Sequence, residues 1–352
     1  MKKNILFAAI GLQLLAFSRA GAQDAAFTQL YASPLLTNPA IVGASNFDRT
    51  SLAYRNQWGS VNSGYSDYNF MTSTPFFLKE QSSKIVVSLA FVDDKAGAFS
   101  QLNGYLSVAY NKKIAENQNV CLALYGAVSQ LGVNTNGLTY DDQFEDGAYN
   151  SAISSGETAL SKSVIYPDAG FGFTWYMNPS RDDSKFNAYA GIAGFHMNEP
   201  NQSLVGSLST LPIRMSYIAG LKLFESDKVD FSPNMMVTTQ AGNIISAVGM
   251  YCCYSINENF KATLGLWYRT HDAIPIVIGF AYKGYELGYS YDMVTSSLTA
   301  YSTGLNANEI TLTVKLPLKK SQGSTAMIGS KNDSDSQTPS TLDPNPSPFP
   351  EF

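Results

Sequence analysis

The sequence has few of the side chains that usually perform catalysis or hold metals. It contains two histidines, His196 and His271, and three cysteines among 352 residues. An odd cysteine count makes no disulfide framework, so we interpret Cys121, Cys252 and Cys253 as small packing residues. Neither histidine is accompanied by a nucleophile elbow, a metal-ligand cluster or a phosphate-binding glycine loop. The sequence therefore predicts a protein that is not an enzyme and that has no catalytic residues, cofactor or metal.

Charge and long apolar segments are also scarce. Charged residues make up 14% of the chain, against about 25% in an ordinary soluble domain. Beyond the N-terminal region no run of about 18 apolar residues occurs, which excludes a helical membrane span there. A formal net charge of -5 makes nucleic acid an unlikely electrostatic partner, and we expect no nucleic acid binding.

The N-terminal residues 1–22, MKKNILFAAIGLQLLAFSRAGA, combine a basic start, a short apolar run and a small-residue cleavage site. This order of features predicts a secretory signal peptide. The apolar run is shorter than the about 20 residues that a membrane helix needs. We expect the mature chain to begin near Gln23, outside the cytoplasm.

Alternating apolar and polar residues dominate the rest of the chain. In YELGYSYDM, one face of an extended strand carries Tyr285, Leu287, Tyr289, Tyr291 and Met293, and the other carries Glu286, Gly288, Ser290 and Asp292. About fourteen such runs occur, at approximately 49–58, 66–76, 84–92, 101–113, 118–131, 166–178, 186–198, 213–224, 228–239, 243–255, 258–270, 273–283, 284–295 and 309–317.

The connections between these runs differ in length according to whether they follow an even-numbered or an odd-numbered run. Links after even-numbered runs, such as LKEQSS, IAENQN and ESD, are short and polar. Links after odd-numbered runs include GSVNSGYS, DDKAGAFS, the long stretch 132–165 and two further long segments, although those near 240–242 and 271–272 are short. An even strand number with long loops on one side is typical of a transmembrane barrel.

The sequence thus predicts an all-β fold, a transmembrane antiparallel β-barrel of about 14 strands over residues 49–318, located in the outer membrane. Its apolar faces would contact lipid, and Lys261, Arg269, Glu286 and Asp292 would face the lumen. A water-soluble β-sandwich with the same aromatic face turned to a core remains the alternative.

Two further segments flank the predicted barrel. Residues 23–48 are apolar, interrupted by proline and too irregular to span lipid, so we expect a segment that enters the lumen or the periplasmic mouth. An ordered lead-in to the first strand is the alternative. Residues 319–352 are rich in Ser and Pro and predict a disordered periplasmic tail. Clustered acids at Asp141-Asp142 and Glu145-Asp146 could suggest calcium, but they lack the spacing of a known loop.

The stretch QDAAFTQLYASPLLTNPAIVGA (23–44) resembles the start of the PorP/SprF family of Bacteroidota, and YRNQW (54–58) is similar to the family's first-strand motif. Ser33 stands where the family usually has Asn. The family-motif residues, to which we assign a structural or partner-binding role, are Phe27, Gln29, Pro34, Asn38, Pro39, Gly43, Tyr54, Arg55 and Trp58.

The resemblance implies an outer-membrane component of the type IX secretion system, involved in exporting proteins with a sorting domain, such as gliding adhesins, and anchoring them at the cell surface. Implied partners are the cargo outside and, beneath the membrane, the periplasmic machinery or a peptidoglycan-binding lipoprotein. Membrane lipid surrounds the barrel. The alternative function is an outer-membrane channel for small or hydrophobic solutes.

Overall fold

Strands make up almost all of the chain that the structure describes. This computed structural model describes residues 24, 26–59, 64–78, 83–135, 138–145, 148–156, 163–177, 187–225, 228–257, 259–296 and 306–316. The predicted signal peptide 1–22 and tail 319–352 lie outside the described residues. The long strands are β1 (Asp48–Gln57), β2 (Tyr65–Phe77), β3 (Ser83–Ala96), β4 (Phe99–Ala115), β5 (Gln118–Val133), β8 (Ser163–Met177), β9 (Asn187–Phe195), β10 (Arg214–Lys222), β12 (Val229–Gln240), β13 (Asn243–Asn257), β14 (Phe260–Arg269), β15 (Ala273–Tyr282), β16 (Tyr285–Val294) and β17 (Ala307–Leu316).

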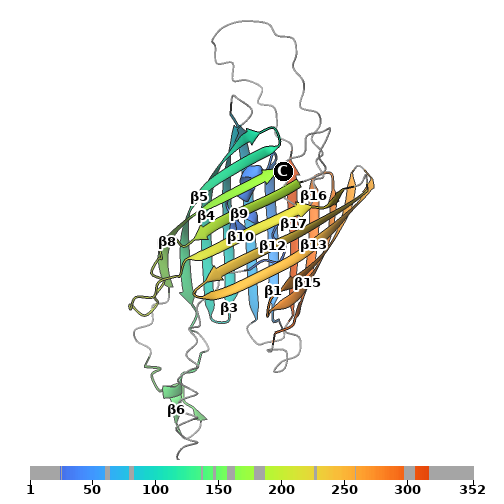
Figure 1. Ribbon diagram of the computed structural model, residues 1–352. Helices are drawn as coiled ribbons and strands as arrows, with labels where there is room; N and C mark the ends of the chain where they lie inside the picture. The colour runs from blue at the N-terminus through green and yellow to red at the C-terminus, as the bar shows by residue number, and fades with distance from the viewer. Residues whose placement is uncertain are drawn as a thin grey trace, which may run out of the picture.

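The main sheet closes on itself. Each long strand pairs antiparallel with the next one along the chain, and β1 pairs with β17 over its whole length. β10 pairs with β12 from Arg214 to Gly220, and the two-residue strand β11 (Phe224–Glu225) adds only a short pairing to β12. The result is a barrel of fourteen long strands (Figure 1), as predicted. Closure leaves no open sheet edge, which a membrane requires because lipid cannot pair with backbone amides.

Side chains alternate between the two faces of the wall as their sequence pattern predicts. In β16, Tyr285, Leu287 and Tyr289 are exposed on the outside, whereas Ser290 and Asp292 are buried inside. In β14, likewise, Leu264, Leu266 and Tyr268 are exposed and Trp267 is buried. The apolar residues therefore form the outer surface, which is the arrangement of a barrel in lipid and the inverse of a protein with an apolar core.

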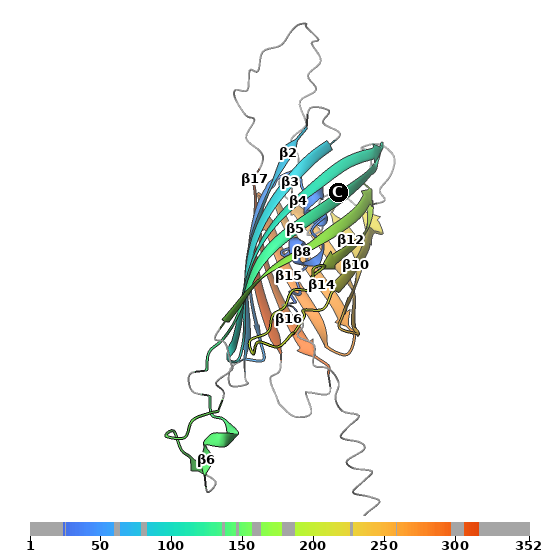
Figure 2. The ribbon, with the colours of Figure 1, turned by 90° about the vertical axis from the view of Figure 1, so that its left-hand side faces the viewer.

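The two ends of the barrel differ. The longest connections, 134–162, 196–213 and 295–306, all lie at one end, here called the loop end. The other end, here called the turn end, contains the two-residue links 116–117, 258–259 and 283–284. Because the strand number is even, β1 begins at the turn end and β17 ends there. The wall is uneven, since β4 and β5 have 17 and 16 residues while β14 to β17 have 10 each (Figure 2).

One predicted loop is wrong. The segment DDKAGAFS was expected to be a long external link, but Asp93–Ala96 belong to β3 and Phe99–Ser100 belong to β4. Only Gly97 and Ala98 form the turn, and Gly97 has a φ of 59°. Glycine adopts this left-handed conformation without strain, so the strands continue nearly to the tip. The polar residues around the turn suggested a loop, so the sequence pattern did not predict that the two strands extend this far.

Inward-facing glycines make room for aromatic rings of neighbouring strands. A Cβ added to Gly249 would lie 2.2 Å from the Trp267 ring, and one added to Gly265 would lie 2.5 Å from Tyr251. Gly170 and Tyr125 make the same arrangement, at 2.3 Å. These glycines are therefore fixed by packing of the inner wall, because any larger residue would displace a buried ring.

The remaining elements are short. The helix α2 (Pro34–Thr37) and the 3-10 helix η1 (Ile41–Ala44) lie inside the barrel, ahead of β1 (Figure 1). In the connection between β5 and β8, η2 (Asp141–Gln143), β6 (Phe144–Glu145) and β7 (Ala148–Tyr149) form a small unit that projects beyond the loop end (Figure 2). Among the described residues, no helix is long and apolar enough to cross a membrane.

A charge placed on the outer face tests the orientation of the wall. Leu264 is exposed near the middle of β14, so Leu264→Arg should destabilise the barrel by about 2–4 kcal/mol when it folds into phospholipid vesicles. Leu264→Met keeps an apolar side chain and should change the free energy of unfolding little. Urea-dependent folding equilibria measure both values, and equal stabilities of the two variants would contradict a lipid-facing Leu264.

Candidate functional site

Residues 26–47, here called the luminal segment, fill the interior of the barrel. Leu35, Ala40 and Val42 pack in one buried cluster with wall residues of β2 to β5, including Val86 and Cys121. Phe27 packs in a second buried cluster, with Ala53 of β1 and Val92 of β3. The segment is irregular because it packs on protein and not on lipid, where unpaired backbone amides would be too costly. It therefore makes the barrel a plugged one.

Carboxylates of β16 and β17 hold the start of the luminal segment near the loop end. The Glu309 carboxylate accepts the backbone N–H groups of Thr28 and Gln29, at 2.7 and 2.9 Å. The Thr28 hydroxyl donates to Asp292 at 2.8 Å. Hydrogen bonds to a charged acceptor are stronger than those between neutral groups, and two consecutive amides bound by one carboxylate fix the direction of the chain there.

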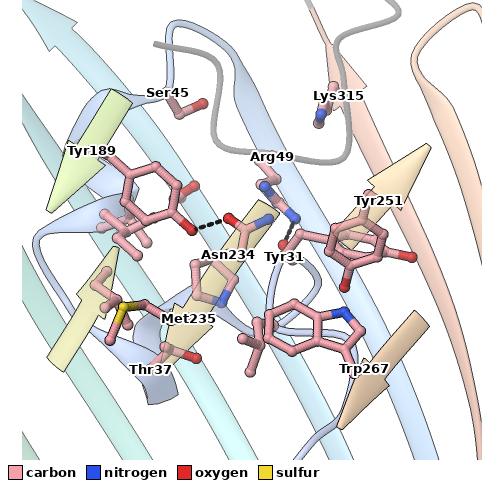
Figure 3. A pocket seen from close by; sticks show the side chains of 16 residues that line it. Tyr31, Thr37, Ser45, Arg49, Tyr189, Asn234, Met235, Tyr251, Trp267 and Lys315 are labelled. Atoms are coloured by element: carbon pink, nitrogen blue, oxygen red, sulfur yellow. Dashed lines mark hydrogen bonds between the residues drawn. The ribbon is translucent and has the colours of Figure 1, made fainter. Parts of the chain in front are cut away.

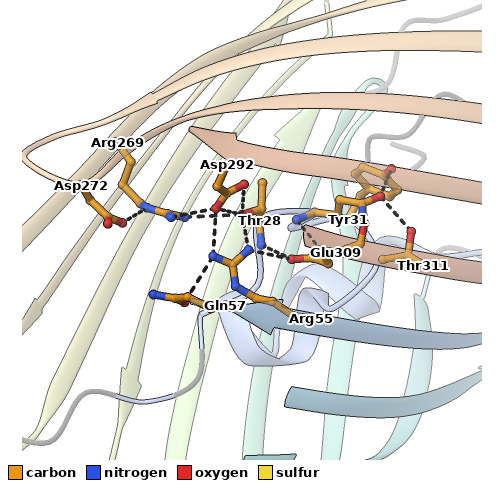
Figure 4. Close-up of polar contacts among 10 residues, drawn as sticks. Thr28, Tyr31, Arg55, Gln57, Arg269, Asp272, Asp292, Glu309 and Thr311 are labelled. Atoms are coloured by element: carbon orange, nitrogen blue, oxygen red, sulfur yellow. Dashed lines mark hydrogen bonds and ion pairs between the residues drawn. The ribbon is translucent and has the colours of Figure 1, made fainter. Parts of the chain in front are cut away.

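Two arginines compensate the negative charge of these buried carboxylates (Figure 4). Arg55 of β1 pairs with Asp292 at 2.8 Å and with Glu309 at 3.4 Å, and Arg269 of β14 pairs with Asp292 at 2.9 Å. The side chains of Arg55, Asp292 and Glu309 are at most 2% exposed. Thr28, Arg55, Arg269, Asp292 and Glu309 are here called the arginine cluster. It connects three neighbouring wall strands, β1, β17 and β16, with β14 and with the luminal segment.

A second polar contact lies on the opposite wall. His196, just beyond the end of β9, contacts Asp168 of β8 through Nδ1 at 2.9 Å and Asp24 through Nε2 at 2.8 Å. Arg214 of β10 pairs with the same Asp24 oxygen at 2.7 Å, and its guanidinium stacks 3.9 Å above the Phe195 ring. Asp24, Asp168, His196 and Arg214 are here called the histidine cluster. It fixes the beginning of the described chain at the loop end.

The charges of this cluster shift the proton affinities of its members. Burial alone would lower the pKa of His196, but hydrogen bonds to Asp168 and Asp24 overcome it and raise the pKa to about 9. Burial would raise the pKa of Asp24, but Arg214 and His196 lower it to about 2. His196 is thus a cation at neutral pH, held between two carboxylates.

Wall glycines let the luminal segment approach the barrel backbone closely. A Cβ added to Gly288 would lie 2.0 Å from Gln29 Oε1, and one added to Gly172 would lie 2.4 Å from Asn38 Oδ1. Asn38 uses that proximity to donate to the carbonyl of Phe173 at 3.0 Å. Conversely, a Cβ on Gly43 of the segment would lie 2.0 Å from Cys121 Sγ. Segment and wall are therefore complementary in shape.

The structure brings together most of the family-motif residues predicted from the sequence. Seven are buried in the lumen: Phe27, Gln29, Pro34, Asn38, Pro39, Gly43 and Arg55. Tyr54 instead points outward, 37% exposed, and its ring is tilted against the Tyr68 ring with the centroids 4.9 Å apart. Trp58 follows β1 and packs edge-on against Tyr65. The luminal members act as one packing unit, and Tyr54 and Trp58 are not part of it.

Sequence reasoning missed the residues that these members contact. Asp168, His196, Arg214 and Glu309 were not predicted to contact the N-terminal residues. The contacts join distant parts of the sequence: Asp24 is 172 residues from His196, and Thr28 is 281 residues from Glu309. A usable signal was present in the alternation, since Glu309 falls on the polar face of its strand. The sequence correctly predicted that Arg269 and Asp292 face the lumen, but it did not predict the residues with which they pair.

Other candidate sites gain no support from the contacts. His196 has a carboxylate at each ring nitrogen, so Nε2 faces Asp24 where a hydrolase would place a nucleophile. His271 lies in the turn after β14, and the adjacent Asp272 pairs with Arg269. Within the described parts of the chain, no three His, Cys, Asp or Glu side chains are arranged to hold a metal. Within the described residues, Cys121, Cys252 and Cys253 form no disulfide.

Removing Arg55 should loosen the luminal segment. Arg55→Met leaves Asp292 and Glu309 with less compensating charge, and breaking a buried ion pair in this way costs about 3–5 kcal/mol. Cys121 lies buried beneath Gly43, so its reaction with a maleimide reports displacement of the segment. In a Cys252→Ala/Cys253→Ala background, Arg55→Met should accelerate that reaction, whereas Lys113→Met on the exposed surface should not. An unchanged rate in Arg55→Met would refute the role of the arginine cluster.

The histidine cluster should make stability depend on pH. The folded-state pKa of His196, about 9, lies above its ordinary value of 6.5, so the stabilisation is fully present below pH 6.5. It should be lost as the pH rises through 9, and its size is about 3 kcal/mol. Thermal unfolding of the detergent-solubilised protein between pH 6 and pH 9.5 measures this loss. His196→Gln should remove most of the slope, and a slope equal to that of the unaltered protein would contradict the assignment.

Solved structures with a similar fold are outer-membrane barrels. The Ralstonia pickettii toluene transporter TbuX superposes with a TM-score of 0.51 at 11% identity, covering 85% of this chain and 96% of that one. A Pseudomonas aeruginosa FadL homologue also gives 0.51, at 8% identity, covering 81% and 94%. At these identities the likeness concerns the fold alone. No curated protein sequence matches the chain.

The sequence itself matches one family. The model of the type IX secretion system membrane protein PorP/SprF matches residues 20–314, which include the luminal segment, the histidine cluster and nearly all of the barrel. The resemblance first noticed at the N-terminus therefore extends over most of the chain. The chain belongs to the PorP/SprF family of type IX secretion system membrane proteins, and its fold is that of a fourteen-stranded outer-membrane β-barrel.

Proposed function

We propose that this barrel anchors a secreted sorting-domain protein, such as a gliding adhesin, at the cell surface. The observation that carries the proposal is the plugged lumen of a protein that belongs to a secretion family. A barrel whose interior is filled by its own chain is suited to hold a partner on its rim. The loop end would face the exterior, since outer-membrane barrels carry their longer loops there.

The loop end offers surfaces suited to a protein partner. In the unit formed by η2, β6 and β7, Phe144 and Tyr149 pack at 5.9 Å and are each about half exposed. The unit is held by Gln143, which donates to the carbonyl of Ile153 at 3.0 Å. In the connection 196–213, Leu208 is 81% exposed. Exposed aromatic and aliphatic side chains on long loops are typical of binding sites.

The turn end would face the periplasm and its machinery. We propose that a periplasmic component, for example a peptidoglycan-binding lipoprotein, contacts the short links there. Cargo above and machinery below would then be connected through one rigid wall. The proposal includes no enzymatic activity, because His196 is held between Asp168 and Asp24.

The alternative is a channel for small or hydrophobic solutes. Its support is the likeness in fold to the toluene transporter TbuX and the FadL homologue. A channel requires a continuous path, whereas the luminal segment contacts the wall on several sides, through the arginine cluster and through Arg214, which donates to the carbonyl of Leu36. We therefore favour the anchor, and the two functions give opposite results in the following experiment.

Cells lacking this protein should release a sorting-domain adhesin into the medium while solute uptake stays normal. Complementation with Phe144→Ser/Tyr149→Ser should restore the barrel but leave several-fold more adhesin in the medium than the unaltered gene does, because the exposed aromatic pair is lost. Tyr285→Ser makes the same type of change at the turn end and should retain the adhesin. Quantitative mass spectrometry of the medium measures the release. Retained adhesin together with slowed uptake of an apolar solute would favour the channel.

A further inference from the structure

The outer face of the barrel carries a groove that is much larger than the cavity in the lumen. Inside, the cavity between the luminal segment and the opposite wall has a volume of about 50 Å³, and Tyr31, Tyr251 and Trp267 close around it (Figure 3). That volume holds a few water molecules and is too small for an organic ligand. The groove on the outer face has a volume of about 500 Å³ and crosses the strands on both sides of β1. Its volume is in the range of ligand-binding pockets.

Two neighbouring rows of outward side chains form the sides of this groove. The row nearer the loop end, in the order set by strand register, consists of Ile310, Tyr54, Tyr68, Asp93 and Leu102. The row nearer the turn end consists of Leu287, Leu312, Leu52, Phe70 and Phe91. Successive outward residues of a strand are separated by one residue that points inward, so the groove lies over such inward residues.

The floor of the groove is backbone. Ala53, Asn69 and Thr311 line it, and each lies between a residue of one row and a residue of the other. Their side chains are buried on the inner face, so it is their backbone that reaches the groove. These backbone groups are already paired in the sheet, and Ala53 faces Thr311 across the junction of β1 with β17. The floor is therefore a surface on which an apolar chain can lie without leaving an amide unpaired.

Packing of aromatic rings within each row keeps the space between the rows open. In the row nearer the loop end, the ring centroids of Tyr54 and Tyr68 are 4.9 Å apart. In the other row, Phe70 and Phe91 are stacked at an interplanar angle of 29°, with centroids 6.5 Å apart. Phe91 also lies against Gly104 of β4, where an added Cβ would be 3.4 Å from its ring. The rings pack along their own rows and not across the groove, and apolar walls fixed in this way suit an apolar ligand.

The polar side chains of the two rows lie on the loop-end side of the groove. Asp93 belongs to that row and pairs with Lys95 at 3.0 Å, and the Lys95 ammonium lies 5.7 Å from the centroid of the Tyr68 ring. Every member of the row nearer the turn end is apolar. Outer-membrane barrels carry their longer loops outside, and tyrosines are enriched where hydrocarbon meets head groups. The polar side therefore faces the head groups of the outer leaflet, and the apolar side faces hydrocarbon.

We propose that this groove binds one acyl chain of a lipid from the outer leaflet of the outer membrane. The chain lies on the backbone of Ala53, Asn69 and Thr311, and the head group lies on the side of Asp93 and Lys95. A lipid fits this place because the surrounding outer face contacts the membrane. An extended protein segment could not pair with the floor, since its backbone groups are already bonded within the sheet. The bound chain crosses the junction of β1 with β17 and so stabilises closure of the barrel.

Native mass spectrometry of the full-length protein in detergent tests the site. Dioleoyl phosphatidylglycerol should bind as a single retained lipid. Dihexanoyl phosphatidylglycerol has the same head group but short chains, and it should bind at least about tenfold more weakly. Phe70→Ala/Phe91→Ala removes one aromatic wall and should weaken binding of the dioleoyl lipid by about tenfold. Phe260→Ala/Phe280→Ala removes a stacked ring pair of β14 and β15, with centroids 6.0 Å apart, and should leave binding unchanged.

A second variant covers the case in which Phe70→Ala/Phe91→Ala fails to fold. Leu52→Trp keeps the outer face apolar but fills the groove, so it should weaken binding of the dioleoyl lipid to a similar extent. Equal binding of the two lipids, unchanged binding in the groove variants, or an equal loss in Phe260→Ala/Phe280→Ala would overturn the proposal. A second copy of the chain that covers the groove in place of the lipid, seen as a dimer in the same spectra, would overturn it as well.

Discussion

The inability of lipid to form hydrogen bonds with the backbone is the constraint on which the rest of this structure depends. Because every amide of the wall must pair with another strand, β1 pairs with β17 and β10 with β12, and no edge is left open. Closure in turn creates an interior that is separate from lipid. Only in such an interior can groups such as Arg55, Asp292 and Glu309 be buried together, since the same charges on the outer face would be expensive.

The interior is used to hold one short segment of the chain. Its affinity for the wall comes from three kinds of contact that reinforce one another. Carboxylates bind backbone amides at Thr28 and Gln29, apolar side chains such as Leu35 pack in the middle, and Lys84 binds the carbonyls of Ala44 and Ser45 near the turn end. The plug is thus fixed at both ends and in the middle, which favours a role as a rigid anchor over that of an open channel.

Burial of so many charges has a consequence for stability. A cluster of compensated ions contributes stability only while each member keeps its protonation state and its partners. In the histidine cluster the same Asp24 oxygen pairs with both His196 and Arg214. Loss of the charge on one of them therefore changes the charge compensation of the other two.

The sequence by itself determined the wall. Strand positions, their number and the direction of each side chain follow from a period of two residues, which is local information that each segment carries independently. The N-terminal motif also identified Gln29, Asn38 and Arg55 as special. What only the tertiary structure decided is where these residues find their partners: Glu309 meets Thr28 and His196 meets Asp24 across most of the chain. The same applies to Gly97, where polar neighbours suggested a long loop. Contacts of this kind depend on closure of the barrel and on the space left inside it. The local sequence pattern of a single strand determines neither of these.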